Sequence, residues 1–190
     1  MDNGTACVST CPVGKYPNST TWTCDPCHTD CQNCTGGLLN ECSSCPNGRY
    51  LEGTTCPTAC VATNVYENTS TNTCDACHSE CATCSGPSNA QCLSCTGIRY
   101  LEGTSCPTAC VATNVYENTS TNTCDACHSE CATCSGPNNT QCLTCTGARY
   151  LEGTSCPTAC VATNLYENTM TNTCDACHSE CASCSGPNNN

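Results

Sequence analysis

Hydrophobic and polar side chains follow one another here without the spacing of three and four residues that an amphipathic helix needs over three turns. Residues 99–105 instead predict a short strand, a turn at Glu102 and Gly103, and a returning strand. Residues 114–119 form a second strand candidate, and residues 85–87 (Ser-Gly-Pro) predict a turn. We therefore expect short β-hairpins and loops with almost no helix, stacked so that each contacts mainly its neighbours.

The cysteines repeat with a period of fifty residues. The chain has 190 residues and 30 cysteines, and Cys56, Cys106 and Cys156 are equivalent. The period divides the chain into a partial repeat 1–24, cysteine-rich repeats 25–74, 75–124 and 125–174, and a partial repeat 175–190. The second and third repeats differ at six positions: Ser88/Asn138, Ala90/Thr140, Ser94/Thr144, Ile98/Ala148, Val115/Leu165 and Ser120/Met170. Such repeats suit a protein selected for length and regularity, although recent duplication without selection is an alternative.

The composition does not provide a conventional hydrophobic core. There is no Phe, one Trp, and 26 residues of Val, Ile, Leu, Met, Trp and Tyr together. Burying so few large side chains cannot offset the conformational entropy lost on ordering the backbone. Roughly fourteen disulfides, each typically stabilising by about 2–4 kcal/mol, make this composition foldable and indicate an oxidising, extracellular compartment.

The charge excludes several classes of partner. The formal net charge is −12, with four Lys and Arg residues against sixteen Asp and Glu residues, and no basic patch occurs. Nucleic acid and anionic membrane surfaces are therefore poor partners. No run of apolar residues approaches the length of a membrane span, so direct membrane insertion is not expected.

The two ends of the sequence suggest a piece of a longer array. Met1 is followed at once by the polar residues Asp2 and Asn3, so no signal peptide is present although the cysteines require secretion. At the other end, the repeat stops two residues short of its next expected cysteine. We expect the natural polypeptide to continue the period in both directions.

Four Cys-x-x-Cys-His motifs raise the question of a cofactor: Cys24 to His28, Cys74 to His78, Cys124 to His128 and Cys174 to His178. The motif alone is the attachment signature of a c-type haem, but no further histidine is left for a second axial ligand. Cys-x-x-Cys spacing also suits structural zinc or a redox dithiol. The extracellular features favour disulfides, so we expect no cofactor and no metal, with a multihaem electron carrier and zinc as alternatives. No dense carboxylate loop for calcium and no catalytic dyad stands out.

Six Asn-x-Ser/Thr sequences are candidate glycosylation sites: Asn3, Asn18, Asn33, Asn68, Asn118 and Asn138. Chance occurrence is the competing explanation in a chain rich in Asn and Thr, and Asn33 is the weakest candidate because Cys34 is its middle residue. Asn68 and Asn118 occupy equivalent polar loops, so we expect both to carry sugar. The equivalent Asn168 has lost its acceptor sequence to Met170 and should carry none.

The segments Cys77–Pro87 (CHSECATCSGP) and Gln91–Cys95 (QCLSC) closely resemble furin-like repeats of the growth-factor-receptor cysteine-rich family. The resemblance covers essentially the whole chain, and the C-H-x-x-C-x-x-C-x-G-P pattern is its specific part. High-copy arrays of this kind resemble surface proteins of ciliates and other protists. The resemblance implies an elongated rod of small disulfide-rich modules, each with one or two disulfides. The chain lacks the globular ligand-binding domains of the receptors.

The disulfide pairing rests on this resemblance, because eight cysteines per repeat allow 105 pairings. The implied pairs are Cys11 with Cys24, Cys27 with Cys34, Cys31 with Cys42, Cys45 with Cys56, Cys60 with Cys74, Cys77 with Cys84, Cys81 with Cys92, Cys95 with Cys106, Cys110 with Cys124, Cys127 with Cys134, Cys131 with Cys142, Cys145 with Cys156, Cys160 with Cys174 and Cys177 with Cys184. Cys7 and Cys181 are left over, and their implied partners lie eleven residues beyond them, outside this sequence.

The sequence thus favours a structural extracellular glycoprotein, not an enzyme. We expect a repeat rod that self-associates into a cell-surface coat, an extracellular filament or a flagellar hair, covered by covalent glycans. The alternative is a receptor or adhesion ectodomain that uses the rod as a spacer or binding module. Repeat-specific exposed aromatic side chains would favour that alternative.

Overall fold

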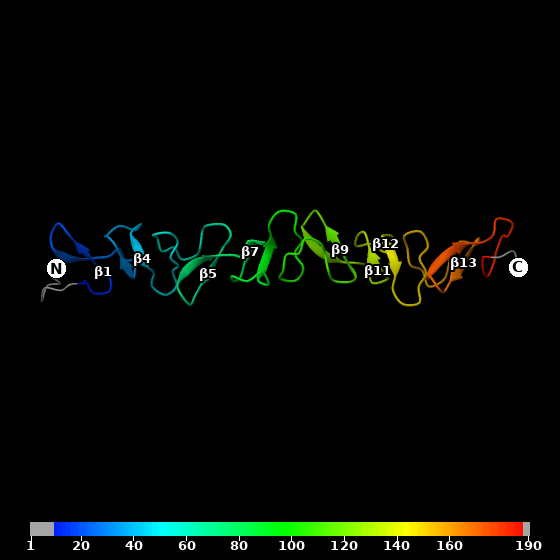
Figure 1. Ribbon diagram of the computed structural model, residues 1–190, viewed down its shortest axis with the longest axis horizontal. Helices are drawn as coiled ribbons and strands as arrows, with labels where there is room; N and C mark the ends of the chain where they lie inside the picture. Colours follow the sequence, from blue (N-terminus) through cyan, green and yellow to red (C-terminus); the bar gives the residue numbers. More distant parts are fainter. Residues whose placement is uncertain (1–9, 188–190) are drawn as a thin grey trace. The chain divides into compact units, whose positions relative to one another are not determined.

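The computed structural model describes residues 10–187, so Asn3 and Cys7 lie outside the described part. Within it, fourteen strands pair into seven two-stranded antiparallel sheets and no helix occurs (Figure 1). Four of the sheets are polar hairpins: β1 (Lys15–Asn18) with β2 (Thr23–Pro26), β5 (Val65–Asn68) with β6 (Thr73–Ala76), β9 (Val115–Asn118) with β10 (Thr123–Ala126), and β13 (Leu165–Asn168) with β14 (Thr173–Ala176). Three are cysteine hairpins: β3 (Asn33–Cys34) with β4 (Cys42–Ser44), β7 (Cys81–Cys84) with β8 (Cys92–Cys95), and β11 (Cys131–Cys134) with β12 (Cys142–Cys145).

The polar hairpins confirm the strand predicted at residues 114–119. In β9 and β10 the register pairs Asn118 with Thr123, leaving a loop of four residues between the strands. The last loop residue, Asn122, has φ of +55°, a left-handed conformation that asparagine tolerates better than most residues. A strand that contains Val and Tyr, followed by a loop that ends in Asn, therefore closes the hairpin locally.

The cysteine hairpins are irregular and contain the turn predicted at residues 85–87. The register of β7 and β8 shifts between Cys81 and Cys84, and the connecting loop starts at Ser85 and ends at Gln91. The Gln91 Oε1 atom accepts the Ser88 N–H at 3.1 Å and lies over Gly86. A Cβ atom at Gly86 would lie 2.5 Å from Gln91 Oε1, so a larger residue there would displace the Gln91 side chain from its bond to Ser88.

The hairpin predicted at residues 99–105 is present in a short form, because bridge residues Glu102 and Ser105 flank its turn and the Tyr100 N–H donates to Pro107 O at 3.1 Å. The turn at Glu102 and Gly103 is present, and Gly103 has φ of +63°. However, Leu101 forms an isolated parallel bridge with Thr123, donating its N–H to Asn122 O at 2.8 Å and accepting the Cys124 N–H at 3.0 Å. The segment therefore pairs with the edge of the following polar hairpin, because that edge offers unpaired backbone groups.

Disulfides take the place of a hydrophobic core. The buried residues are cysteines and the loop glycines Gly36, Gly86 and Gly136, and no polar side chain is buried among the described residues. In the third repeat, Cys127, Cys131, Cys134, Cys142 and Cys156 form one buried cluster against which Tyr116 and Leu151 pack. This confirms small disulfide-rich repeats without a conventional core.

Fourteen disulfides lie in the described part, and they join the same cysteines that the family resemblance pairs. Their Cα–Cα distances run from 5.0 to 5.7 Å, within the range normal for disulfides. Cys181 is the one free cysteine among residues 10–187, at the position where Cys81 and Cys131 are bonded.

The chain divides into two compact units. The first runs to Thr96 and includes Thr104–Cys106, and the second comprises Gly97–Gly103 and the chain from Pro107 onward. Inside each unit a polar hairpin contacts the cysteine hairpin that follows it, as β5 contacts β7 and β9 contacts β11. The elongated rod stays a prediction. Residues 10–187 contain no helix long and apolar enough to span a membrane.

Candidate functional site

The Cys-x-x-Cys-His motifs are structural in this fold. In the third copy, Cys124 is bonded to Cys110 and Cys127 is bonded to Cys134. A thioether to haem and a thiolate bond to zinc both require a sulfur that is not already in a disulfide. Neither haem nor zinc therefore fits these motifs. In the described part of the chain, no three His, Cys, Asp or Glu side chains cluster closely enough to hold a metal.

The histidine of each motif closes a turn. His128 Nδ1 accepts the N–H of Glu130 at 3.3 Å, and the same bond occurs at His28, His78 and His178. The ring is thus the cap of a two-residue turn that positions the following carboxylate.

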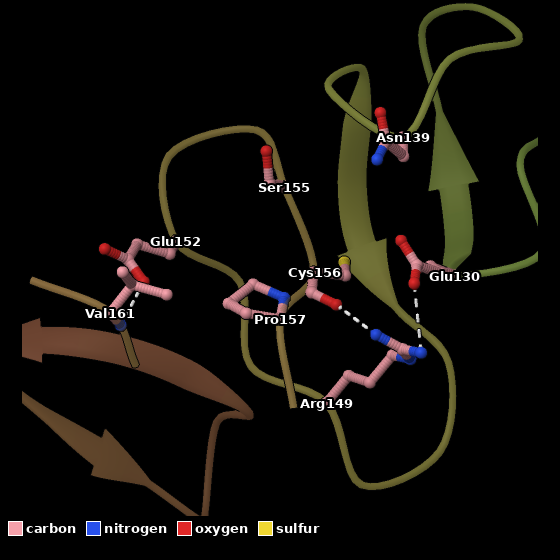
Figure 2. Close-up of a pocket in the computed structure, with 8 residues that line it drawn as sticks. All are labelled: Glu130, Asn139, Arg149, Glu152, Ser155, Cys156, Pro157 and Val161. Atoms are coloured by element: carbon pink, nitrogen blue, oxygen red, sulfur yellow. Dashed lines mark hydrogen bonds and ion pairs between the residues drawn. The ribbon is translucent and has the colours of Figure 1, made fainter. Parts of the chain in front are cut away.

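The carboxylate so positioned pairs with an arginine in a hollow of about 380 Å³ (Figure 2). Arg149 donates from one guanidinium nitrogen to Cys156 O at 2.7 Å and pairs through the other with Glu130 Oε1 at 3.0 Å. Figure 2 shows the guanidinium between these two acceptors, with Asn139 and Ser155 outside this set of bonds. The arginine thereby connects the turn after His128 to the Cys145–Cys156 disulfide loop.

A second carboxylate in the same hollow orders the next loop. Glu152 Oε2 accepts the Val161 N–H at 2.8 Å, and Oε1 accepts the Ala162 N–H at 3.0 Å. Both oxygens are thus used by the backbone of the loop that follows Cys160. The charged groups of this hollow therefore hold the fold through these hydrogen bonds and the ion pair.

The end of each polar hairpin is held by a set of side chains that we call the hairpin clamp. In the β9–β10 hairpin it comprises Asn118, Thr123 and Asp125. Asn118 Nδ2 donates to Asp125 Oδ2 at 2.7 Å, and the Thr123 hydroxyl donates to Asp125 Oδ1 at 2.7 Å. Asn118 Oδ1 also accepts the Ser120 N–H at 3.1 Å. The hydrogen bonds from Asn118 and then Thr123 hold the pKa of Asp125 below its usual value.

The hairpin clamp occurs in all four polar hairpins. Its asparagines are Asn18, Asn68, Asn118 and Asn168, and each donates from Nδ2 to its aspartate at 2.6 or 2.7 Å. The equivalent aspartates Asp25, Asp75 and Asp175 also have a lowered pKa because they accept hydrogen bonds from Asn and Thr side chains.

The described glycosylation candidates differ in how the fold uses their amides. Asn18, Asn68 and Asn118 belong to hairpin clamps. Asn33 Nδ2 donates to the Ser44 hydroxyl at 2.9 Å across β3 and β4. Asn138 lies exposed in the loop after β11, and among the hydrogen bonds of the described residues none involves its side chain. Glycosylation itself stays a prediction at all of these residues.

Two smaller hollows recur at equivalent places. One, of about 350 Å³, is lined by Cys60, Val65, Tyr66, Glu67, Cys84 and Ser85. The other, of about 340 Å³, is lined by Cys160, Leu165, Tyr166, Glu167, Cys184 and Ser185. Each lies where a polar hairpin meets the start of the next cysteine loop, so these hollows are a by-product of the repeat geometry.

Among the described aromatic residues, Trp22 differs from the others in its exposure and in its backbone conformation. Its side chain is 69 % exposed and its φ is +59°, at the position that Asn72, Asn122 and Asn172 occupy in the other polar hairpins. A bulky residue with positive φ is uncommon and carries strain. Trp22 is therefore a repeat-specific exposed aromatic residue, although a single one.

Cysteine spacing and glycosylation sequences did not reveal the hairpin clamp or the pair of an arginine with a carboxylate. Both nevertheless have signals in the sequence. Asn168 remains in place although its acceptor sequence is lost, and an aspartate follows each clamp asparagine after seven residues. Both facts point to a structural asparagine. The carboxylate two residues after each histidine is the corresponding signal for the arginine pair.

Comparison with known proteins gives one family. The sequence matches the family described as growth factor receptor domain IV over residues 82–190, more than half of the chain. No curated protein matches the chain.

Proposed function

The chain belongs to the growth factor receptor domain IV family, and from this premise we propose that it is a structural extracellular glycoprotein. The family and the disulfides make it an extracellular or secreted cysteine-rich module of the receptor type. This cysteine-rich family is not enzymatic. The finer role that we propose is self-association into a cell-surface coat, an extracellular filament or a flagellar hair.

The observation that supports this proposal is that the polar side chains of successive repeats form equivalent intramolecular hydrogen bonds. The clamp bond has the same length, to within 0.1 Å, at Asn68, Asn118 and Asn168. The glutamates Glu52 and Glu152 order equivalent loops through equivalent backbone bonds. Side chains used in this way stabilise a frame and leave few groups for recognition of a small ligand.

The proposed mechanism is mechanical. Each fifty-residue period contains four disulfides, as Cys77–Cys84, Cys81–Cys92, Cys95–Cys106 and Cys110–Cys124 show. The loops that they close span only 7 to 14 residues, so extension of the chain is limited at every module. The fifty-residue period then sets the spacing of surface groups along an assembly. The net negative charge of the chain keeps the protein soluble.

Electron microscopy of the native surface material tests this role. Filaments or a continuous coat with a regular repeat are expected. A non-reducing gel should also show disulfide-linked oligomers of higher molecular mass than the single chain. Dispersed single molecules, each attached to a different protein, would contradict self-association and favour a receptor or adhesion spacer.

The receptor or adhesion alternative has one observation of its own, the exposed Trp22 in the first polar hairpin. Aromatic side chains of this kind often anchor protein interfaces. A Trp22→Asn variant that no longer retains a cell-surface partner, while the native chain does, would favour this alternative over the structural role.

A further inference from the structure

We infer that Asn138 carries an N-linked sugar, and that Asn18, Asn68 and Asn118 are structural residues that carry none. The inference needs only the extracellular setting of the chain and is independent of the coat or filament role. It reverses the expectation that the equivalent positions of Asn68 and Asn118 suggested.

The clamp already uses the nitrogen to which a sugar would be attached. Asn68 Nδ2 donates to Asp75 Oδ2 at 2.7 Å, while Asn68 Oδ1 accepts the Ser70 N–H at 3.0 Å. Asn68 is half-buried, and Asp75 is fixed from its other side by the Thr73 hydroxyl at 2.7 Å. Attachment of a sugar would remove one hydrogen from Nδ2 and place a bulky ring beside this carboxylate.

The third repeat shows that the clamp needs no glycan. Met170 stands where Ser120 stands in the second repeat, so Asn168 is outside any acceptor sequence. Asn168 nevertheless donates to Asp175 at 2.6 Å and accepts the Met170 N–H at 3.1 Å, as Asn118 does with its own partners. The asparagine is therefore explained by the clamp alone.

Asn138 differs in both burial and bonding. Its backbone is fixed, because its N–H donates to Gln141 Oε1 at 3.1 Å and its carbonyl accepts the Gln141 N–H at 3.0 Å. Its side chain and that of Thr140, the hydroxyl residue of the acceptor sequence, are both exposed. A sugar on Asn138 Nδ2 therefore displaces no hydrogen bond of the described residues and projects into solvent.

The modification is an ordinary glycosyl transfer from a lipid-linked oligosaccharide pyrophosphate. A bond forms between Asn138 Nδ2 and the anomeric carbon of the oligosaccharide. The bond from that carbon to the pyrophosphate oxygen breaks, and the lipid pyrophosphate leaves with the electron pair. One proton of the amide nitrogen is lost to a base of the transferase.

Glycopeptide mass spectrometry of the secreted chain tests the inference, with two variants that add an acceptor sequence. Met170→Ser restores an Asn-x-Ser sequence at the clamp residue Asn168. Ser88→Asn combined with Ala90→Thr copies the Asn138 acceptor into the second repeat. The native chain should carry sugar on Asn138, the double variant should gain one further glycan, and Met170→Ser should gain none.

A sugar on Asn18, Asn68 or Asn118, a sugar gained with Met170→Ser, or an unmodified Asn138 would each overturn the inference.

Amide hydrogen exchange tests the clamp independently of sugar. Asn118→Gln and Asn168→Gln should each accelerate exchange in their own hairpin by about fivefold, since each loses a hydrogen bond to a carboxylate. Ser120→Ala, which abolishes the acceptor sequence and keeps the clamp, should leave exchange unchanged. Acceleration by Ser120→Ala with no effect of Asn168→Gln would assign the stability to a glycan and overturn the inference.

Discussion

Trp22 is held in a left-handed backbone conformation, so its replacement by asparagine is expected to stabilise the first polar hairpin. Its φ of +59° matches the values of +55°, +55° and +54° at Asn72, Asn122 and Asn172. The four hairpins therefore share one loop conformation, and three of them have a residue suited to it. The Trp22→Asn variant places that residue in the fourth.

The size of the effect follows from the balance between backbone strain and side-chain burial. The left-handed conformation costs an ordinary L-residue roughly 1–2 kcal/mol, and asparagine avoids part of this cost. Trp22 is 69 % exposed, so its removal sacrifices little apolar burial. Its N–H donates to Asn18 O at 2.9 Å, a backbone bond that the variant keeps. We expect a net stabilisation of about 1 kcal/mol, which corresponds to about fivefold slower exchange through local opening.

The assay is amide hydrogen exchange at Cys27, whose N–H donates to Gly14 O at 2.9 Å across the base of this hairpin. Asn122→Trp is the matched control, followed at Cys127, whose N–H donates to Asn114 O at 2.9 Å. It should accelerate exchange by a similar factor. If Trp22→Asn leaves exchange at Cys27 unchanged or accelerates it, the strained backbone at Trp22 does not limit the stability of this hairpin, and the explanation is refuted.

The disulfides and the hairpin clamp lead to three further expected results. Non-reducing peptide mapping should join Cys77 to Cys84, and a bond from Cys74 to Cys77 would contradict the pairing. Thiol reductants should unfold the chain while EDTA leaves it folded, and the reverse result would restore the zinc alternative. The lowered pKa of Asp125, caused by the Asn118 amide and then by a threonine hydroxyl, adds stability above the unfolded pKa of about 3.9. That stability is lost as pH falls through the lower, folded pKa; a carboxyl group titrating at its usual value by NMR would refute it.

The repeat architecture was predictable because it depends on short-range features. Cysteine spacing and the lack of large apolar residues predict small disulfide-rich modules, and the segment 114–119 predicts the strand β9. The strands β7 and β8 were not predicted. They consist of Cys, Ala, Thr, Leu and Ser, which show no clear alternation, and their pairing depends on disulfides between them and nearby loops.

The partner of Leu101 could not be predicted from its own segment. Its neighbours suggest a local hairpin, yet Leu101 pairs with Thr123, more than twenty residues later. Which edge is available to it depends on how the loop closed by Cys110 and Cys124 folds back. Similarly, the local sequence at Asn118 suggests only a sugar acceptor, because the bond to Asp125 appears once the hairpin register is known.

The differences between the second and third repeats lie where the fold makes least use of side chains. At four of the six positions the residue is exposed in both repeats, and these are Ser88/Asn138, Ala90/Thr140, Ile98/Ala148 and Ser120/Met170. At Ser94/Thr144 both hydroxyls bond a threonine hydroxyl of the facing strand, at 2.6 and 2.7 Å. The sixth, Val115/Leu165, exchanges one aliphatic residue for another. Apart from the Ala90 N–H to Ser88 Oγ bond of 3.2 Å, which has no counterpart at Asn138, substitution has spared the side-chain contacts that hold each module.

The divergent first repeat shows the same constraint more strongly, since it keeps the contacts while changing the residues. Arg49 pairs with Asp30 at 2.8 Å, where the third repeat uses Glu130. Glu41 Oε2 accepts the Leu38 N–H at 2.9 Å, in the place where the later repeats have a glutamine. Relaxed duplication would erode such contacts in the most divergent copy. Their retention with different residues indicates that each module depends on these contacts to fold.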